Sequence, residues 1–376
     1  MKILLVITKS EIGGAQVFVL NLARALQQAG LYVEVAAGEG NFLFEELQKH
    51  NISYHYLNSL KRDFSVLNSF YFIFDLHRLL KRNNYDIVHL NSSNTLFGAI
   101  STYLLKKKPR TLFTFHGLSL LDKNYKTSRT IKFLAKVYFR FFLQFVDKTV
   151  FVSKLNFDES NESGFIRNIE VIYNGLDEKE MSFLCKDEAR KYFCDKCGTD
   201  FSDSFLIGST GRLAYQKNYE FLINNFSLIK EKIPEAKIII IGEGPNYDMF
   251  SKKICTLGIA NDFFLVGPIK ESYRYIKAFD VFTLPSRYEG LSISLIEAIF
   301  ADIPILASDV GGNSEIVGNG SNQLFRLDDP IDYVLKLLEI HKDRNRFIES
   351  NSKLKGNFSI DKMVRSYRKL YEIMVG

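Results

Sequence analysis

Short apolar runs of strand length alternate with longer helical patterns along most of this 376-residue chain. Near-continuous apolar strands joined by helices are typical of parallel sheets that helices cover on both faces. The alternation restarts after Asn174-Gly175, so the sequence predicts an α/β protein with two doubly wound, Rossmann-like domains. The expected strands are 3–7, 32–36, 86–90, 110–115 and 148–152 in the first run, and 205–209, 237–241, 263–266, 281–284 and 304–307 in the second.

These runs indicate where the domains begin and end. We expect an N-terminal domain over 1–173, a C-terminal domain over 174–360, and a last helix in 361–376 that crosses back to the first domain. Doubly wound domains bind ligands at the carboxyl ends of their strands. We therefore expect the two domains to face a cleft, with the functional residues in the loops that follow the strands. Helical patterns between the strands are clearest at 16–28, 66–81 and 220–232.

One of these loops, in the segment 286–298, holds two glutamates eight positions apart, Glu289 before a helix and Glu297 inside it. At a rise of roughly 1.5 Å per helical residue they lie too far apart for an acid/base pair. They are better suited to holding two ends of one elongated ligand. The helix start between them, with Ser292 and Ser294 as candidate caps, offers backbone N–H groups to an anion. This arrangement suggests a sugar, a diphosphate and a ribose.

Three other strand ends carry residues with candidate roles, and each has an ordinary alternative. The Arg212 fork and the Lys217 charge suit a pyrophosphate, although such a pair is more often solvated surface. Gly13-Gly14 allows a close approach of the backbone to an anion, or simply joins a strand to a helix. His116 ends a strand and is placed to donate to a sugar hydroxyl or phosphate, or it is a packed core histidine.

The positive charge of the chain is concentrated in 106–148, which holds eleven Lys or Arg and two Asp or Glu. Within it, 129–146 reads as a helix with a basic stripe and many aromatic residues. This pattern indicates either a core helix with a solvated face or an interfacial helix on anionic lipid. A nucleic-acid partner is not expected, because no recognition motif accompanies the basic patch. The sequence contains no apolar run near the roughly 20 residues that span a bilayer.

Five motifs in order resemble the family-4 group of retaining, nucleotide-sugar-dependent glycosyltransferases with the two-domain GT-B fold. They are Gly13-Gly14-Ala15-Gln16, Asn174-Gly175-Leu176-Asp177, Gly211-Arg212-Leu213 with Lys217-Asn218, Glu289 with Glu297, and Gly311-Gly312 with Glu315. One departure is Gln16, where many members carry Glu, and it concerns the acceptor side.

The resemblance implies a role for each candidate residue. Arg212 and Lys217 are expected to hold the donor diphosphate, and Glu297 the ribose hydroxyls. Glu289, with the backbone of Gly290, Leu291 and Ser292, is expected to hold the transferred sugar. His116 is expected beside the reacting sugar, and Gly13 and Gly14 near the phosphates.

The resemblance also implies the activity. It is that of a retaining, metal-independent hexosyltransferase of lipopolysaccharide or capsule synthesis, with a nucleotide-sugar donor, expected to be UDP-linked, as substrate and no cofactor. The expected acceptor is a polyprenyl-linked or other glycan, and the expected location is the cytoplasm or the inner membrane face, with 106–148 on anionic lipid. A sugar-nucleotide epimerase or hydrolase on the same fold, and a non-catalytic binding module, remain alternatives.

Overall fold

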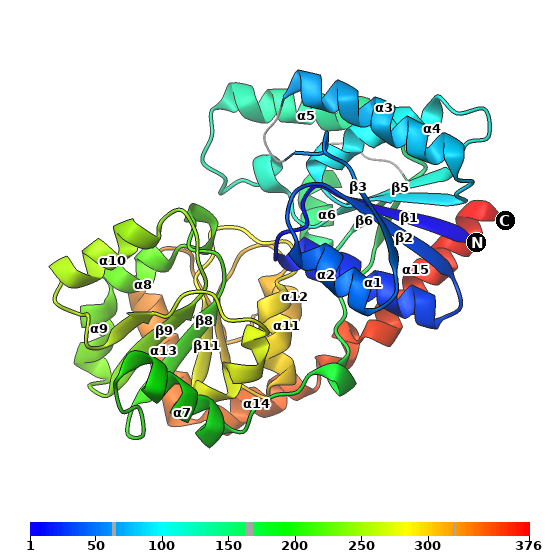
Figure 1. Cartoon of the computed structure of the whole chain (residues 1–376). Helices are drawn as coiled ribbons and strands as arrows, with labels where there is room; N and C mark the ends of the chain where they lie inside the picture. The colour runs from blue at the N-terminus through cyan, green and yellow to red at the C-terminus, as the bar shows by residue number, and fades with distance from the viewer. Residues whose placement is uncertain (62–64, 162–167, 319) are drawn as a thin grey trace. The chain divides into compact units, whose positions relative to one another are not determined.

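The computed structural model describes residues 1–61, 65–161, 168–318 and 320–376. The chain divides into two compact units (Figure 1). Unit 1 comprises Met1–Leu176 and Phe358–Gly376, and unit 2 comprises Asp177–Asn357. The chain therefore leaves unit 1 after Leu176 and returns to it at Phe358, whereas the sequence placed the boundaries at 173/174 and 360/361.

Unit 1 is built on a parallel sheet in which seven of the described strands take the order β3-β2-β1-β4-β5-β6-β7. The edge strand β3 was not predicted, because its polar and aromatic side chains are mostly exposed and form no apolar run. β7 was not predicted because it has three residues. The strands are β1 (Lys2–Ile7), β2 (Tyr32–Ala37), β3 (Ser53–Tyr56), β4 (Ile87–Leu90), β5 (Arg110–Phe115), β6 (Lys148–Phe151) and β7 (Ile169–Val171).

Helices cover both faces of this sheet, as the apolar strands require. One layer consists of α1, α2 and α15, and the other of α3, α4 and α5 (Figure 1). A further helix, α6, follows β6. The helices are α1 (Gly14–Gln28), α2 (Phe42–Lys49), α3 (Val66–Arg82), α4 (Gly98–Tyr103), α5 (Arg129–Leu143), α6 (Lys154–Asn161) and α15 (Ile360–Val375), with 3₁₀ turns at Ser93–Phe97 and Ser119–Leu121.

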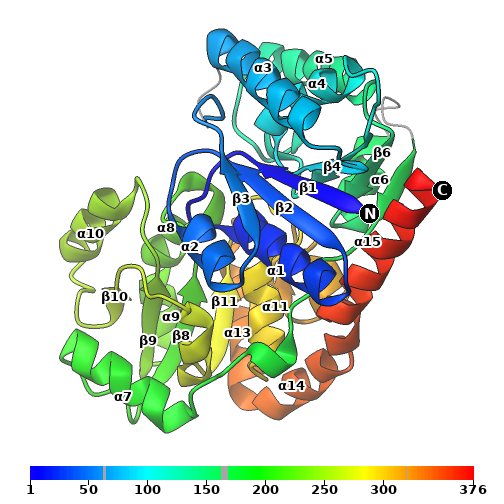
Figure 2. The same cartoon turned by 45° about the vertical axis from the view of Figure 1, so that its right-hand side comes forward.

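The last helix of the chain, α15, is part of the core of unit 1. It lies beside α1 (Figure 2), where the ring of Tyr367 packs 5.7 Å from that of Phe18. Tyr371 is fully buried, and its hydroxyl lies 2.7 Å from Nδ1 of His89 on β4. His89 also contacts Thr114 through Nε2 at 2.7 Å, so this histidine is a satisfied core residue.

Unit 2 contains a parallel sheet in which six of the described strands take the order β10-β9-β8-β11-β12-β13. The strands are β8 (Phe205–Thr210), β9 (Ala236–Ile241), β10 (Phe263–Leu265), β11 (Val281–Leu284), β12 (Ile305–Ser308) and β13 (Leu324–Phe325). The helices are α7 (Lys186–Cys197), α8 (Tyr219–Asn224), α9 (Phe226–Lys232), α10 (Tyr247–Thr256), α11 (Ile293–Phe300), α12 (Asn313–Val317), α13 (Pro330–Lys342) and α14 (Arg344–Ser352), with 3₁₀ turns at Glu178–Glu180, Tyr215–Lys217, Ser272–Ala278 and Lys355–Phe358. The two parallel sheets confirm the predicted fold class.

The single helix predicted over 220–232 is wrong, because the structure has two helices, α8 and α9, separated at Asn225. Asn225 leaves the helical conformation, with ψ at 10°, and its side-chain amide donates to the carbonyl of Phe221 at 2.8 Å. Such a bond from an Asn side chain to nearby backbone competes with helix propagation.

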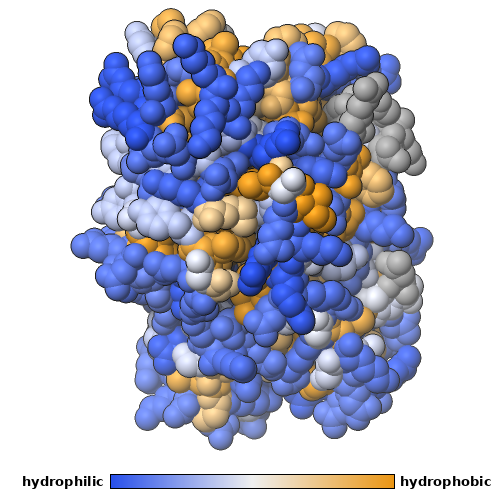
Figure 3. Space-filling view, turned by 90° about the vertical axis from the view of Figure 1, so that its right-hand side faces the viewer, coloured by the Kyte–Doolittle hydropathy of each residue, from blue (hydrophilic) through white to orange (hydrophobic). Residues whose placement is uncertain are grey.

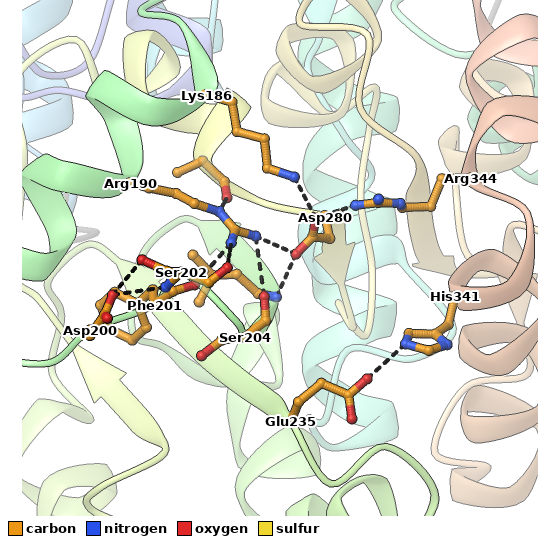
Figure 4. Close-up of polar contacts among 12 residues, drawn as sticks. Lys186, Arg190, Asp200, Phe201, Ser202, Ser204, Glu235, Asp280, His341 and Arg344 are labelled. Carbon is orange, nitrogen blue, oxygen red and sulfur yellow. Dashed lines mark hydrogen bonds and ion pairs between the residues drawn. The ribbon is translucent and has the colours of Figure 1, made fainter.

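A buried carboxylate holds unit 2 together at the amino end of its sheet (Figure 4). Asp280, 4% exposed, accepts from Lys186 at 2.8 Å and from Arg190 at 2.5 Å, and it also pairs with Arg344. Its Oδ2 accepts from the backbone N–H of Leu206 at 2.8 Å as well. One carboxylate therefore links α7, α14 and the starts of two neighbouring strands, on the edge opposite the loops that carry the candidate residues.

Candidate functional site

Two loops at the carboxyl edge of the unit 2 sheet are joined to each other. The loop after β8 provides Tyr215 and Gln216, and the loop after β11 provides Arg287 and Tyr288. Arg287 N–H donates to the carbonyl of Gln216 at 2.8 Å, and the Gln216 side chain donates to the carbonyl of Tyr288 at 3.1 Å. The Arg287 guanidinium lies 4.4 Å from the centre of the Tyr215 ring. These contacts hold the two loops in one fixed arrangement.

This arrangement brings Lys217 and Glu289 together. Lys217 Nζ donates to Glu289 Oε1 at 2.7 Å, and the two side chains are 16% and 7% exposed. The stem of Lys217 runs so close to Gly211 that a Cβ there would lie 3.2 Å from Lys217 Cε and 2.7 Å from the hydroxyl of Tyr219. The structure thus places the predicted diphosphate ligand and the predicted sugar ligand in direct contact.

Glu297 lies on α11, close enough to Lys217 for the positive charge of the lysine to affect the pKa of its carboxyl group. Protein surrounds its carboxyl group, and this burial raises the pKa of Glu297 to about 8, although the attraction of Lys217 opposes the shift. Burial disfavours the ionised form because the carboxylate loses water. Lys217 therefore acts on both glutamates of the 286–298 segment.

The glycine pair 311–312 contacts the backbone at the start of the segment between the two glutamates. Gly312 N–H donates to the carbonyl of Gly290 at 2.8 Å. Gly311 has a φ of +49°, and a Cβ at this position would lie 2.1 Å from the carbonyl oxygen of Glu289. No other residue type fits at Gly311 without displacing the loop, so this turn positions Glu289.

The start of α11 lies between the two glutamates. Ser292 is the residue before the helix, and its hydroxyl faces that of Ser294 at 3.1 Å. Among the described residues, its side chain caps no backbone N–H of the helix. First-turn N–H groups of a helix lack intrahelical partners, so the Leu291–Ser292 region presents donors and a positive dipole end. The expected capping by Ser292 and Ser294 is wrong, since the two hydroxyls bond to each other.

Arg212, the second predicted diphosphate ligand, follows Gly211 in the loop after β8 and is exposed. It lies in the same loop as Lys217. A guanidinium offers several N–H donors in a planar fork, which suits the binding of a phosphate group.

The candidate residues of unit 1 lie at the carboxyl edge of its own sheet. His116 follows β5, its ring packs edge-on against Phe18 at 4.6 Å, and its Nε2 lies 3.1 Å from Asn91 Oδ1. The Asn91 amide donates to the carbonyl of His89, which leaves its oxygen to face His116. Nε2 of His116 therefore carries the proton, and Nδ1 is left as an acceptor. Burial lowers the pKa of His116 to about 3, so the ring is neutral at neutral pH.

Gly13 precedes α1 and Gly14 is its first residue, one turn before Phe18. Gly13 is extended and caps α1 through its carbonyl, which accepts from Val17 N–H at 2.9 Å. Gln16, the departure from the family pattern, donates through its amide to the carbonyl of Lys9 at 3.1 Å. A glutamate could not donate there, so the substitution gives the glycine loop an anchor of its own.

In the described ranges, no three or more His, Cys, Asp or Glu side chains form a group that could hold a metal ion. Three residues that shape the site were not predicted from the sequence, namely Arg287, Gln216 and Tyr219. Arg287 stands two positions before Glu289, but its spacing alone does not reveal that it stacks on Tyr215.

Two units in one chain, each built on a parallel, doubly wound sheet, are the architecture of the GT-B class of fold. Comparison with known proteins agrees. Residues 12–180 match the model of the Glycosyltransferase Family 4 domain, and residues 198–354 match that of Glycosyl transferases group 1. Together the two models span most of the chain, which therefore consists of these two glycosyltransferase domains.

Individual relatives extend along most of the chain. It is 29% identical to a UDP-Gal:alpha-D-GlcNAc-diphosphoundecaprenol alpha-1,3-galactosyltransferase of Escherichia coli, over 85% of this chain and 84% of that protein. It is 26% identical to the O-antigen biosynthesis glycosyltransferase WbnH of Escherichia coli, over 97% of both chains. Among solved structures, Anabaena HepE in complex with UDP and glucose has a TM-score of 0.82 at 19% identity, over 99% of this chain and 100% of that one.

Proposed function

We propose that this glycosyltransferase moves a hexose from a UDP-linked sugar, with retention and without a metal ion, to a hydroxyl of a lipid-linked or oligosaccharide acceptor in the assembly of a surface polysaccharide. The observation that carries the proposal is the Lys217–Glu289 pair beside Glu297 at the uncapped start of α11. The printed names of the relatives, with UDP-Gal, a diphosphoundecaprenol acceptor and O-antigen biosynthesis, support the choice of donor and acceptor.

The donor diphosphate binds to Lys217, Arg212 and the backbone N–H groups of the first turn of α11. As the sugar departs, negative charge grows on the diphosphate, and these fixed cations and dipoles stabilise it. When Lys217 turns to the diphosphate, Glu289 is freed to accept hydrogen bonds from the transferred sugar. Glu297 binds the ribose hydroxyls.

Retention follows from attack on the face that the diphosphate leaves. The bond between the anomeric carbon and the phosphate oxygen breaks, the bond to the acceptor oxygen forms, and the acceptor proton passes to the departing diphosphate. His116, neutral and with Nδ1 as an acceptor, takes a hydrogen bond from a hydroxyl of the reacting sugar.

We place the enzyme in the cytoplasm. The four cysteines all lie in described ranges and are free thiols, two of them exposed. Free exposed thiols persist in a reducing compartment.

Measuring UDP release and product formation with and without a glycan acceptor tests this function. Acceptor-dependent UDP release, an α-anomeric product from an α-linked donor, and activity in EDTA are expected. UDP release without any acceptor would instead favour the hydrolase alternative, conversion of the donor sugar without UDP release would favour the epimerase, and neither reaction would favour a binding module. Loss of activity in EDTA that manganese or magnesium restores would contradict metal independence.

Two conservative variants separate the roles of the glutamates. Glu297→Gln should mainly raise the donor KM, because ribose contacts bind the ground and transition states alike. Glu289→Gln should mainly lower kcat, because sugar contacts tighten as charge develops. Reversed effects would mean that Glu289 binds the ribose and Glu297 binds the transferred sugar.

A further inference from the structure

The outer surface of the α3, α4 and α5 layer of unit 1 is unusually apolar for an exposed surface. The inner sides of these helices pack on the sheet through residues such as Phe72, Leu76 and Phe139. Their outer sides carry large hydrophobic side chains that are 49–69% exposed. These are Leu67, Phe70, Tyr71 and Phe74 on α3, Tyr103 and Leu104 at the end of α4, and Phe133, Leu134, Val137 and Phe141 on α5.

The exposed residues follow helical spacing rather than occurring singly. On α3 they occupy positions i, i+3, i+4 and i+7 from Leu67, which form one stripe. On α5 they run from Phe133 through Val137 to Phe141, again on one side of the helix. Each helix therefore has two apolar sides, and only the inner one is covered by the core of unit 1. Contiguous exposed patches of this kind mark interaction surfaces.

The charge around this apolar surface is strongly positive. The segment 66–143 contains thirteen Lys or Arg and three Asp or Glu. Of these three acidic residues, Asp122 is buried, Asp75 accepts a hydrogen bond from Ser59, and Asp86 accepts one from the backbone N–H of Lys2. Exposed basic residues lie at the end of α3, after α4 and along α5, namely Arg78, Lys81, Arg82, Lys106, Lys107, Lys108, Arg129, Lys136 and Arg140. At the top of Figure 3, where this layer lies, hydrophobic side chains alternate with hydrophilic ones.

We propose that the outer face of α3, α4 and α5 docks on a bilayer that contains anionic phospholipids. The aromatic and aliphatic side chains enter the boundary between headgroups and acyl chains, and the surrounding Lys and Arg bind lipid phosphates. The inference rests on the proposed function to the extent that a lipid-linked acceptor lies in the same membrane. The proposed membrane-binding face also includes α3, which lies outside the basic segment 106–148 that the sequence indicated.

Charge and chemistry favour a membrane over other occupants. Two copies of the chain meeting through this face would bring two strongly positive surfaces together. A nucleic acid would satisfy the cations but would leave aliphatic side chains such as Leu67, Leu104 and Leu134 unburied. An anionic bilayer satisfies both the charge and the apolar stripes. None of the helices in the described ranges is long and apolar enough to cross a bilayer.

Lys132 lies on α5 but is not one of the basic residues of this face. Lys132 Nζ donates to the carbonyls of Asp122 at 2.8 Å and Lys123 at 3.2 Å, so it anchors the loop before α5. Replacing Lys132 would disturb that loop. Variants that test the docking should leave it unchanged.

Co-sedimentation with vesicles tests the docking. One variant combines Phe70→Ser with Phe74→Ser, and a second combines Lys107→Gln, Lys136→Gln and Arg140→Gln. The matched controls lie in unit 2: Ile331→Ser with Leu335→Ser, which are 58% and 56% exposed, and Lys252→Gln with Lys342→Gln, also exposed. Melting temperature and the thermal shift caused by UDP show for each variant that both units remain folded.

Wild type and controls should sediment with phosphatidylglycerol vesicles and far less with phosphatidylcholine alone. The charge variant should bind the anionic vesicles about a hundredfold more weakly, because each basic residue contributes roughly fivefold. The aromatic variant should lose about tenfold or more on the same vesicles. Transfer to a membrane-embedded acceptor should fall in both, while the UDP thermal shift stays at the wild-type value.

Equal sedimentation of wild type and folded variants would overturn the docking. A wild-type dimer that the aromatic variant dissociates, without vesicle binding, would assign the face to a second copy. These outcomes are separate from the fate of the proposed function. Vesicle binding without transfer to any acceptor would contradict the function alone, and transfer without vesicle binding would contradict the docking alone.

Discussion

Lys217 faces two carboxylates, and in the proposed function a donor diphosphate competes with both. Its ammonium group bonds to Glu289 and lowers the energy of the ionised form of Glu297. Glu289 is 7% exposed, and Lys217 is the cation bonded to its carboxylate. The lysine therefore has a structural role in the free protein, and the proposed function adds a binding role when the donor is present.

Lys217→Ala and Arg212→Ala distinguish these roles. Each should weaken UDP-sugar binding by about tenfold to a hundredfold, since a charge-assisted hydrogen bond contributes roughly 1.5–3 kcal/mol. Lys217→Ala should also lower the melting temperature, because Glu289 is left buried without its cation. Arg212→Ala should not, because Arg212 is exposed. Calorimetric titration with UDP and thermal unfolding measure both effects, and unchanged affinity in either variant would remove that residue from the diphosphate site.

The raised pKa of Glu297 gives a pH dependence with a definite sign. Between the unfolded value of 4.5 and the folded value of about 8, the folded protein holds a proton that the unfolded chain has lost. The free energy of unfolding therefore falls as pH rises through this window, by at most about 1.4 kcal/mol per pH unit from this group. Glu297→Gln should remove that contribution. Urea unfolding at several pH values compares the two proteins, and equal slopes would mean that Glu297 titrates normally.

At the scale of elements, the start of α11 and the turn before α12 form one assembly. The glycine pair 311–312 supports the backbone of Glu289 and Gly290 from the neighbouring strand end. The sequence predicted the strand, the loop and the helix of the 286–298 segment. It left open whether the glycine pair has a role, because support of one loop by another depends on the order of strands in the sheet.

Gly311→Ala tests this support. The added Cβ would collide with the carbonyl of Glu289 and should lower kcat by about tenfold or more as the sugar-binding loop moves. Gly258→Ala is the control, because Gly258 has a φ of +68° and nothing within 4 Å of the added Cβ. Both variants carry backbone strain of about 1–2 kcal/mol. Only Gly311→Ala should lose activity, and equal activities would show that the glycine pair merely joins a strand to a helix.

On the scale of the whole molecule, the chain passes from one unit to the other twice. The two connecting segments are hydrogen-bonded to each other. Leu176 and Ser359 form a parallel bridge, in which Leu176 N–H donates to Phe358 and its carbonyl accepts from Ile360, both at 2.9 Å. The end of the chain thereby completes the core of its beginning through α15. Stability of unit 1 consequently depends on residues more than 250 positions away from those that they contact.

Tyr371→Phe measures this dependence. Removing the hydroxyl leaves Nδ1 of buried His89 without its 2.7 Å partner, which should cost about 1–3 kcal/mol of unfolding free energy. Tyr367→Phe should cost less, because the hydroxyl of Tyr367 makes a longer contact of 3.3 Å to Thr114. Hydrogen exchange should show the loss in unit 1. If Tyr371→Phe leaves the free energy of unfolding unchanged, the imidazole of His89 has another hydrogen-bond partner.

The alternation of apolar strands and amphipathic helices was enough to determine two parallel α/β units, because side-chain periodicity is a local property that sequence displays directly. The residue types around Glu289, Glu297, Lys217, Arg212 and His116 also indicated a sugar-nucleotide site. Edge strand β3 and the break at Asn225 were not predictable in this way. Both depend on burial and on a side-chain bond that the pattern does not encode.

Only the tertiary structure decided how those residues meet. Lys217 and Glu289 are 72 positions apart, and their pairing arises because β8 and β11 are neighbours in the sheet. The proton on Nε2 of His116 depends on Asn91, on a different strand end, and the apolar outer face of α3 to α5 depends on which side of each helix the sheet covers. These are long-range relations, since contact and burial belong to the folded chain and not to any one segment of it.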